Sequence, residues 1–141
     1  MDGVGGERDS VTEQEINNLA AAWVEYGLLR NDSVKREEFD WAPSRVIDMA
    51  FDDGESLWKL ILAIHSLDQS RLIQPVFAAG PLEDLLAHHG DRFIDMVESE
   101  ARRDPSFAKV LGGVWKNQMS DEVWERVQAV WDRRGWDDVP E

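Results

Sequence analysis

The sequence predicts an all-α protein, a compact array of about seven or eight mostly short helices packed as antiparallel hairpins, with no sheet. Apolar residues recur at spacings of three and four through most of the chain, which is the period of one helix face. No window alternates with the strand period, and β-branched runs are missing. Proline and glycine divide the helical pattern into short segments with tight corners, which favours stacked hairpins, similar to a fragment of a solenoid.

The length of 141 residues is typical of one domain. Residues 1–11 are Gly-rich, polar and without periodicity, so they predict a flexible N-terminal tail. Residues 12–141 predict a single helical domain, for which seven tryptophans and five phenylalanines supply bulky core side chains. A chain of this length buries about two-thirds of its unfolded surface.

The first two predicted helices have recognisable start and stop signals. Thr12 followed by Glu15 forms a capping box that opens a long helix. That helix is expected to end near Leu29, before the turn-forming residues 31–33. Residues 34–41 predict a second, shorter helix.

A third helix is predicted to open at Pro43 and to bury one apolar face before a turn at residues 52–54. The residues assigned to that face are Val46, Ile47, Ala50 and Phe51. Residues 56–67 are apolar nearly all round, which predicts a helix in the middle of the domain, covered on more than one side. Residues 68–74 predict a helical turn that Pro75 breaks.

Residues 78–101 predict two short helices joined by a sharp corner. Gly80-Pro81 is a start signal, since proline at the first helical position gives up an N–H that has no partner there. Gly90 is suited to the left-handed conformation that ends a helix, and Asp91 is placed to cap the second helix.

The first of these two helices has a distinct apolar stripe. Its residues are Leu82, Leu85, Leu86 and His89. Replacing Leu85 or Leu86 by alanine is expected to cost about 2–5 kcal/mol. Glu83 is assigned to the outer face, where a substitution is expected to cost little.

The C-terminal part predicts two more helices. Asp104-Pro105 is a cap followed by a proline start, and the helix that follows ends at residues 112–113. Ser120 opens the last helix. The tail, residues 135–141, is predicted to fold back over the bundle.

The formal net charge is -14, from 29 acidic and 15 basic side chains. Such a surface repels nucleic acid and anionic membranes, because phosphate binding requires clustered Lys and Arg. It attracts a basic partner and speeds the encounter with it. We therefore expect a protein partner, for which the charge favours a basic protein, and no direct nucleic-acid binding. The other interpretation is a solvated surface without a partner.

Several observations favour a cytoplasmic protein. The chain has no cysteine, which excludes disulfides and thiolate metal sites and suits a reducing compartment. Its opening residues lack the basic start and apolar run of a signal peptide. The longest apolar stretch, Leu60 to Ile64, is too short to cross a bilayer, so no membrane association is expected.

The histidines give only a weak indication of a metal site. His88 and His89 are adjacent, so on a helix they point about 100° apart and cannot both face one ion. A metal-dependent enzyme built on them would need Asp84, Asp91 or Asp95 as further ligands, and no H-E-x-x-H spacing is present. The favoured interpretation is two histidines at a helix C-terminus, stabilised by the helix dipole.

The sequence therefore assigns no catalytic, cofactor-binding or metal-binding residue and predicts that the protein is not an enzyme. His65 shares a stripe with Trp58 and Leu62 and is expected to be hydrogen-bonded and half-buried. Cysteine nucleophiles, G-x-S-x-G and phosphate-binding glycine loops are missing. The sequence indicates no combination of a nucleophile, a general base and a group that stabilises the transition state.

The densest charge, between residues 37 and 55, has seven acidic side chains against one arginine. We interpret part of it as a partner-binding surface with an aromatic anchor. The residues assigned to it are Glu37, Glu38, Asp40, Trp41, Asp52, Asp53 and Glu55. The alternative, which the sequence favours, packs Trp41 in the core beneath two polar helix faces. Trp115 and Trp136 allow the same two interpretations, and an exposed one is the better interface candidate.

Four segments together resemble an uncharacterised bacterial family of small acidic helical proteins, known only as a domain of unknown function. They are A-A-G-P-L-E-D-L-L-A-H-H-G, A-R-R-D-P-S-F, L-G-G-V-W and D-R-R-G-W-D. The likeness runs from about Trp58 to Trp136, and more loosely upstream through Trp41. The resemblance implies a stand-alone bacterial protein and brings no activity, cofactor or site.

Size, acidity and helical architecture favour a protein-binding module of the immunity, antitoxin or regulatory kind. The metal-dependent enzyme using His88 or His89 is one alternative. A structural or accessory subunit is another. A nucleic-acid mimic is a third, and it requires ordered rows of exposed acidic side chains.

Overall fold

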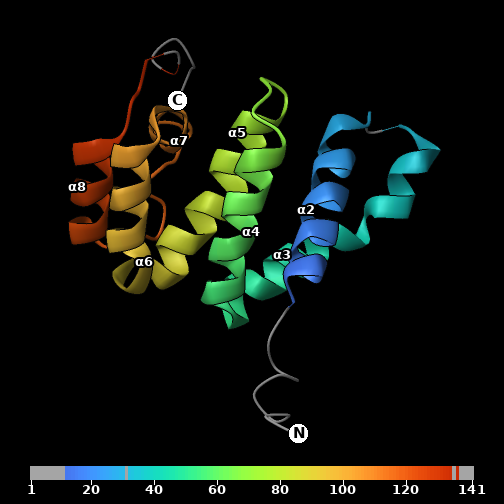
Figure 1. The fold of residues 1–141 in the computed structure, drawn as a ribbon, viewed down its shortest axis with the longest axis horizontal. Helices are drawn as coiled ribbons and strands as arrows, with labels where there is room; N and C mark the ends of the chain where they lie inside the picture. The colour runs from blue at the N-terminus through green and yellow to red at the C-terminus, as the bar shows by residue number, and fades with distance from the viewer. Residues whose placement is uncertain (1–11, 31, 135, 137–141) are drawn as a thin grey trace, which may run out of the picture. The chain divides into compact units, whose positions relative to one another are not determined.

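The computed structural model describes residues 12–30, 32–134 and 136. The predicted N-terminal tail and most of the predicted C-terminal tail lie outside these residues. Within them every regular element is helical and none is a strand, so the all-α prediction is confirmed (Figure 1). The elements are α2 (Glu13–Leu28), the 3₁₀ helix η1 (Val34–Phe39), α3 (Trp41–Asp52), α4 (Gly54–Leu67), α5 (Ile73–Phe77), the π-helix η2 (Ala78–Leu82), α6 (Glu83–Arg103), α7 (Pro105–Leu111) and α8 (Asp121–Val130).

The chain forms two compact units, one within residues 1–68 and the other within residues 69–141. The first unit contains α2, η1, α3 and α4, and the second contains α5 to α8. Each is described separately below. The prediction of a single domain over residues 12–141 stays a prediction.

In the first unit α4 packs against both α2 and α3. The predicted capping box opens α2: Thr12 Oγ1 accepts the Glu15 N–H at 3.1 Å, and Glu15 Oε1 accepts the Thr12 N–H at 3.0 Å. The residues of α4 that face the core are almost free of solvent contact. They are Leu57, Leu60, Ile61 and Ile64. The prediction that this helix lies in the interior is confirmed for the first unit.

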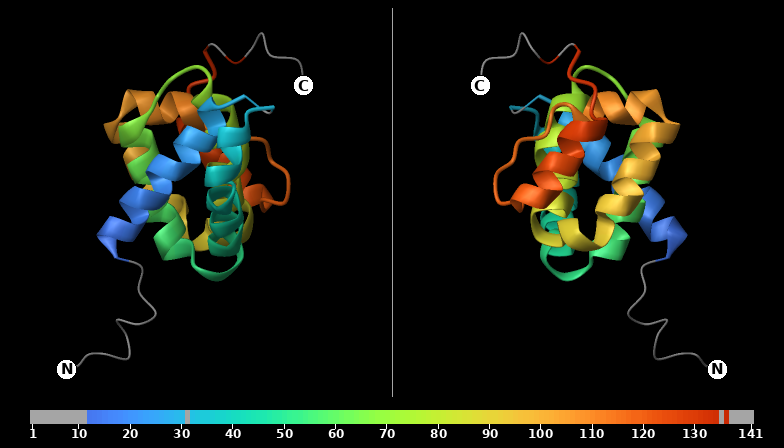
Figure 2. Two further views of the ribbon diagram at one scale, coloured as in Figure 1. Left: turned by 90° about the vertical axis from the view of Figure 1, so that its right-hand side faces the viewer. Right: turned by 90° about the vertical axis from the view of Figure 1, so that its left-hand side faces the viewer.

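The 3₁₀ helix η1 is held against α2 by a single arginine. Arg36 Nε donates to the Tyr26 carbonyl at 3.1 Å, and its guanidinium lies 3.7 Å from the centre of the Tyr26 ring. α3 begins at Trp41, two residues earlier than predicted. Pro43 therefore occupies the first turn, where a backbone N–H has no partner within the helix. α2 and α3 lie side by side in the left view of Figure 2.

In the second unit the proline signals were misread. α5, η2 and the first part of α6 follow one another without a break from Ile73 to a kink at His89. Pro75 lies in the first turn of α5 and does not break a helix, because an N–H at that position needs no helical partner. Pro81 lies inside the π-helix η2 and does not open a helix. The wider hydrogen-bond pattern of a π-turn accommodates its missing N–H.

The predicted corner inside residues 78–101 is confirmed, because α6 consists of two helices that meet at a kink. It lies at His89, whose φ of -134° and ψ of 20° are not helical. Gly90 is not in the left-handed region, so its predicted role as a helix stop is wrong, as is the cap assigned to Asp91. A Cβ on Gly90 would lie 3.0 Å from Val123 Cγ2. Glycine is placed there because α6 and α8 approach closely.

Glu83 is the clearest correction in the second unit. Its side chain is only 7% exposed, although the helical pattern assigns it to the outer face. Oε1 accepts the Trp115 backbone N–H at 3.0 Å, and Oε2 accepts Asn117 Nδ2–H at 2.8 Å. Asn117 has a positive φ of 47°, a conformation that asparagine tolerates better than most residues. The carboxylate therefore fixes the loop between α7 and α8.

α6 and α8 are joined by an arginine fork. Arg126 Nε donates to Glu98 Oε2 at 2.8 Å, and Arg126 Nη2 donates to Glu98 Oε1 at 2.7 Å. The same guanidinium contacts Asp95. The hydrogen bonds from Arg126 hold the pKa of Glu98 below its ordinary value. Ser120 caps α8 as predicted, accepting the Val123 N–H at 3.1 Å.

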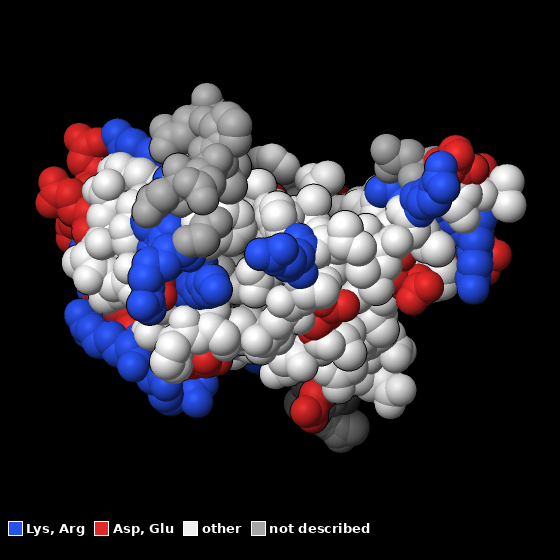
Figure 3. Space-filling model, turned by 90° about the horizontal axis from the view of Figure 1, so that it is seen from above, with Lys and Arg blue, Asp and Glu red and all other residues white. Residues whose placement is uncertain are grey.

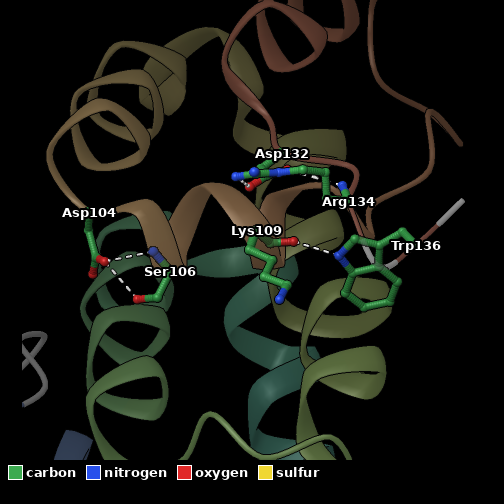
Figure 4. A network of polar contacts seen from close by, with 6 residues as sticks. All are labelled: Asp104, Ser106, Lys109, Asp132, Arg134 and Trp136. Atoms are coloured by element: carbon green, nitrogen blue, oxygen red, sulfur yellow. Dashed lines mark hydrogen bonds and ion pairs between the residues drawn. The ribbon is translucent and has the colours of Figure 1, made fainter.

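The segment after α8 closes over α7 (Figure 4). The predicted Asp104 cap is confirmed, since its carboxylate accepts the Ser106 N–H at 3.0 Å. Trp136 Nε1 donates to the Lys109 carbonyl at 2.6 Å. A Cβ on Gly113 would lie 2.7 Å from the Trp136 ring, and one on Gly112 would collide with the Asp132 carbonyl. Glycine occupies both positions at the end of α7 because Asp132 and Trp136 leave no room for a side chain there.

Candidate functional site

The outer face of α3 exposes three large apolar side chains, which we call the α3 ridge. They are Trp41 (50% exposed), Ile47 (53%) and Phe51 (65%). With a helix turning about 100° per residue, the three lie within an arc of about 120° and span about 15 Å along the axis. Large apolar side chains grouped on one exposed face indicate an interaction surface.

The opposite face of α3 is buried, and it differs from the predicted face. Its residues are Ala42, Val46, Met49 and Ala50. Ile47 and Phe51 were assigned to this face and are in fact exposed, because each lies about 100° around the helix from its buried neighbour. The placement of Trp41 in the core is also wrong. A signal was present in the sequence: Ala42, Val46, Met49 and Ala50 alone form a narrower and more regular stripe.

The predicted acidic residues fall into two groups at the two ends of α3. Glu37, Glu38 and Asp40 precede the helix, are exposed, and form the first acidic cluster. Asp52 and Glu55 lie at its other end, are also exposed, and form the second acidic cluster. Trp41 and Asp52 are eleven residues apart, which corresponds to about 16 Å along the helix axis. The predicted acidic residues therefore lie on η1, at the start of α3 and at the turn into α4, before and after the α3 ridge in the chain.

Asp53 has a structural role within this set. Its carboxylate accepts the Ser56 backbone N–H at 3.1 Å and the Ser56 hydroxyl at 2.7 Å, which caps the start of α4. The sequence grouped it with the surface acids because of its charge. Its hydrogen bonds fix the turn between α3 and α4 and so hold the second acidic cluster in place.

The segment that contains α3 is strongly negative. Between residues 37 and 55 seven acidic side chains stand against Arg45, a net charge of -6. Like charges spaced along one surface produce a field that favours cations and repels phosphate groups. Asp48 is also exposed and falls within the same arc as the ridge residues, so the surface can form ion pairs beside its apolar side chains as well as at its ends.

The histidines lie elsewhere and form no ligand set. His88 is exposed and His89 is at the kink, with its ring edge toward Phe93 at 6.4 Å between centroids. Because two helices meet at the kink at His89, both histidines lie at the end of the first of them, as predicted. His65 is buried rather than half-buried. In the described part of the chain no group of three or more His, Asp or Glu side chains could hold a metal ion.

One carboxyl near the histidines has a perturbed pKa. Partial burial raises the pKa of Asp84, and the charge of His88 opposes that shift. A hollow of about 400 Å³ lies at the kink, and its polar lining consists of His88, His89, Asp91, Arg92, Gln118 and Ser120. Asp84 does not line it. The raised pKa and the hollow therefore do not combine into an acid–base site.

The two remaining tryptophan predictions have different outcomes. Trp115 is 48% exposed, on the loop that Glu83 holds. Trp136 packs against Gly113 and donates its indole N–H to Lys109, so it stabilises the fold of the second unit.

A groove of about 750 Å³ also lies between α2 and α4 in the first unit. Its walls are mostly small or apolar, among them Ala20, Ala63 and Leu67. Glu13 and Lys59 lie on its lining with opposite charges, so charge favours neither a cationic nor an anionic ligand.

Surface charge on the face shown in Figure 3 is mixed. Acidic and basic side chains are interspersed with broad uncharged areas. A nucleic-acid mimic needs continuous rows of acids, and the coloured residues of that face do not form one.

Residues 29–135 match the model of DUF6869, which is described as a family of unknown function. This match spans more than half of the chain. The protein belongs to the DUF6869 family. The predicted resemblance to a domain of unknown function is thereby confirmed, while the bacterial origin stays a prediction. No curated protein and no solved structure matches the chain.

In this DUF6869 protein the segments that carried the resemblance are explained by packing. Three of the segments contribute residues to the contacts around α7 that are described above. These residues are Asp104 of A-R-R-D-P-S-F, Gly113 of L-G-G-V-W and Trp136 of D-R-R-G-W-D. A-A-G-P-L-E-D-L-L-A-H-H-G contains the π-turn and Glu83. All four segments lie in the second unit, whereas the α3 ridge lies in the first.

Among the described helices of the DUF6869 protein, none has the length and apolar character needed to cross a membrane. The predicted cytoplasmic location stays a prediction.

Proposed function

We propose that this DUF6869 protein is a non-catalytic protein-binding module, of the immunity, antitoxin or regulatory kind, that docks a basic partner protein on the α3 ridge. The observation that supports this proposal is the exposure of Trp41, Ile47 and Phe51 on one helix face between two acidic clusters. An apolar centre with a charged rim is the usual anatomy of a protein interface.

The apolar centre supplies binding energy. Fully burying one large apolar side chain contributes about 1.5–3 kcal/mol, and each ridge residue retains half or more of its exposure. Tryptophan is also among the residues that most often dominate interface energetics. Trp41 at one end of the ridge and Phe51 at the other are the expected anchors.

The charge decides which partners are admitted. The net charge of -6 between residues 37 and 55 attracts Lys and Arg and disfavours nucleic acid and anionic membranes. The same charge disfavours a second copy of the chain, since a symmetric contact through this face would place the acidic clusters against one another. A basic protein other than a second copy of this chain is attracted by the negative charge and avoids the repulsion between two acidic faces.

The proposal is tested by affinity capture with matched variants. Tagged wild type, Ile47→Ala/Phe51→Ala and the control Leu72→Ala/Met96→Ala are incubated with host lysate at physiological salt. The control removes two apolar side chains of comparable exposure from the second unit. We expect a basic protein that wild type and control retain, that the ridge variant loses, and that rising salt releases.

The captured protein is then purified and titrated directly. Truncating central anchors of an interface costs about 2 kcal/mol or more, so the ridge variant should bind about 30-fold more weakly. Equal affinity of the ridge variant and wild type would refute the docking surface, as would the absence of any salt-sensitive partner.

A further inference from the structure

We infer that the segment of the partner that docks on the α3 ridge is an amphipathic helix of about three turns with basic residues at both ends. This inference rests on the proposed function and specifies its partner. It follows from the length of the ridge, from its backbone chemistry and from the placement of the two acidic clusters.

The ridge is a row of side chains on a helix, and its backbone groups are already paired within α3. The N–H of Asp53, for example, closes the last turn on the Met49 carbonyl at 2.9 Å. α3 therefore offers no open edge that could pair with an incoming strand. A strand laid on the ridge would place its own backbone N–H and C=O groups against apolar side chains, which is unfavourable.

A helix meets these conditions. Its backbone groups are satisfied internally, and its side chains can pack between those of α3 as ridges into grooves. The stretch from Trp41 to Phe51 covers about 15 Å, which equals about ten residues of a partner helix. Apolar residues at positions i, i+3 or i+4, i+7 and i+10 or i+11 of that helix would cover the three ridge side chains.

The two acidic clusters define the ends of the partner. Glu37, Glu38 and Asp40 lie before Trp41, and Asp52 and Glu55 lie beyond Phe51. A partner helix spanning both would carry Lys or Arg about 11 residues apart along one helix. Two separate sets of ion pairs fix its position along α3. Exposed Asp48, which lies between them within the ridge arc, can pair with a further basic residue at the edge of the partner's apolar stripe.

Synthetic peptides test the inference on the full-length protein. The probe is a capped, fluorescein-labelled peptide of about 14 residues, with a leucine stripe at i, i+4, i+7 and i+11 and a Lys pair at each end, so that the two pairs are about 11 residues apart. One comparison peptide has the same composition with the leucines distributed around the helix. A second keeps the leucine stripe and replaces the terminal lysines with glutamate. Binding is measured by fluorescence anisotropy at low and physiological salt.

We expect the probe to bind about tenfold or more tightly than either comparison peptide. We also expect the affinity of Ile47→Ala/Phe51→Ala for the probe to fall by a similar factor, while that of Leu72→Ala/Met96→Ala changes less than about twofold. The circular dichroism of the bound probe should show a gain in helix.

Two results would overturn the inference while leaving the proposed function intact. One is equal binding of the probe and its permuted form, which would show that charge alone decides. The other is a captured natural partner that depends on the ridge but contacts it through a strand or loop, as located by hydrogen exchange. Failure of the ridge variant to alter any interaction, in capture or with peptides, would instead refute the proposed function.

Discussion

Glu83→Ala is expected to destabilise the second unit by an amount that a surface substitution would not produce. The carboxylate is buried, and it is the acceptor for both Trp115 N–H and Asn117 Nδ2–H. These donors lie 32 and 34 residues away in sequence, so the two hydrogen bonds close a long loop over α6. Removing the side chain releases that loop.

The magnitude follows from the number and type of bonds. A hydrogen bond to a charged group contributes about 1.5–3 kcal/mol, and Glu83 accepts two of them. Trp115 and Asn117 both lie on the exposed loop, so water can replace part of the lost interaction. We therefore expect a decrease in unfolding free energy of about 2–4 kcal/mol.

Urea unfolding of wild type, Glu83→Ala, Glu83→Gln and the control Glu125→Ala measures this difference. Glu125 is exposed on α8, and its replacement should change stability by less than about 0.5 kcal/mol. The glutamine variant keeps one acceptor and should fall between wild type and alanine. Hydrogen exchange at the Trp115 amide should accelerate in Glu83→Ala. Equal stability of Glu83→Ala and Glu125→Ala would refute the account of the buried carboxylate.

Two further predictions concern close packing and pH. Gly112→Ala should cost about 1–3 kcal/mol by thermal unfolding because its Cβ would collide with backbone, whereas Gly80→Ala, which meets nothing within 4 Å, should be neutral or stabilising by up to about 1 kcal/mol. Arg126 lowers the pKa of Glu98 in the folded protein below the ordinary pKa that this side chain has in the unfolded chain. The ion pair therefore contributes stability above the ordinary pKa of Glu98, and this stability is lost as the pH falls through the lowered pKa of the folded protein. Arg126→Ala should therefore have a lower Tm than wild type at pH about 7, with the gap narrowing below pH about 4, while exposed Arg71→Ala shows no such trend.

Signals that act within one turn of helix could be predicted from the sequence. Thr12, Asp104 and Ser120 each cap the helix that their position indicated, because a cap depends only on residues two or three places away. The all-α class follows from the same local periodicity. The error at Pro81 has a different origin, since a π-turn has no comparably clear sequence pattern.

Contacts between distant parts of the chain could not be predicted in this way. Gly90 was assigned a backbone conformation, but its small size is required by Val123, 33 residues away. Glu83 was placed on an outer face because nothing nearby in sequence announces the loop that covers it. For the candidate site, the acidic residues and Trp41 were assigned from the sequence to one partner-binding surface, and that assignment stays a prediction. Ile47 and Phe51 were missed because each neighbours a buried residue.

These positions separate the residues that hold the fold from those proposed to bind a partner. Glu83 and the glycines of the second unit make hydrogen bonds and close packing contacts that hold the fold of that unit. The α3 ridge belongs to the first unit, and its side chains are at least half exposed. Glu83→Ala should therefore lower stability and leave the affinity for the basic amphipathic probe within about twofold of wild type at a temperature where both are folded. Ile47→Ala/Phe51→Ala should do the reverse, because exposed side chains contribute little to folding. A single variant that abolished both properties would show that stability and docking depend on one another.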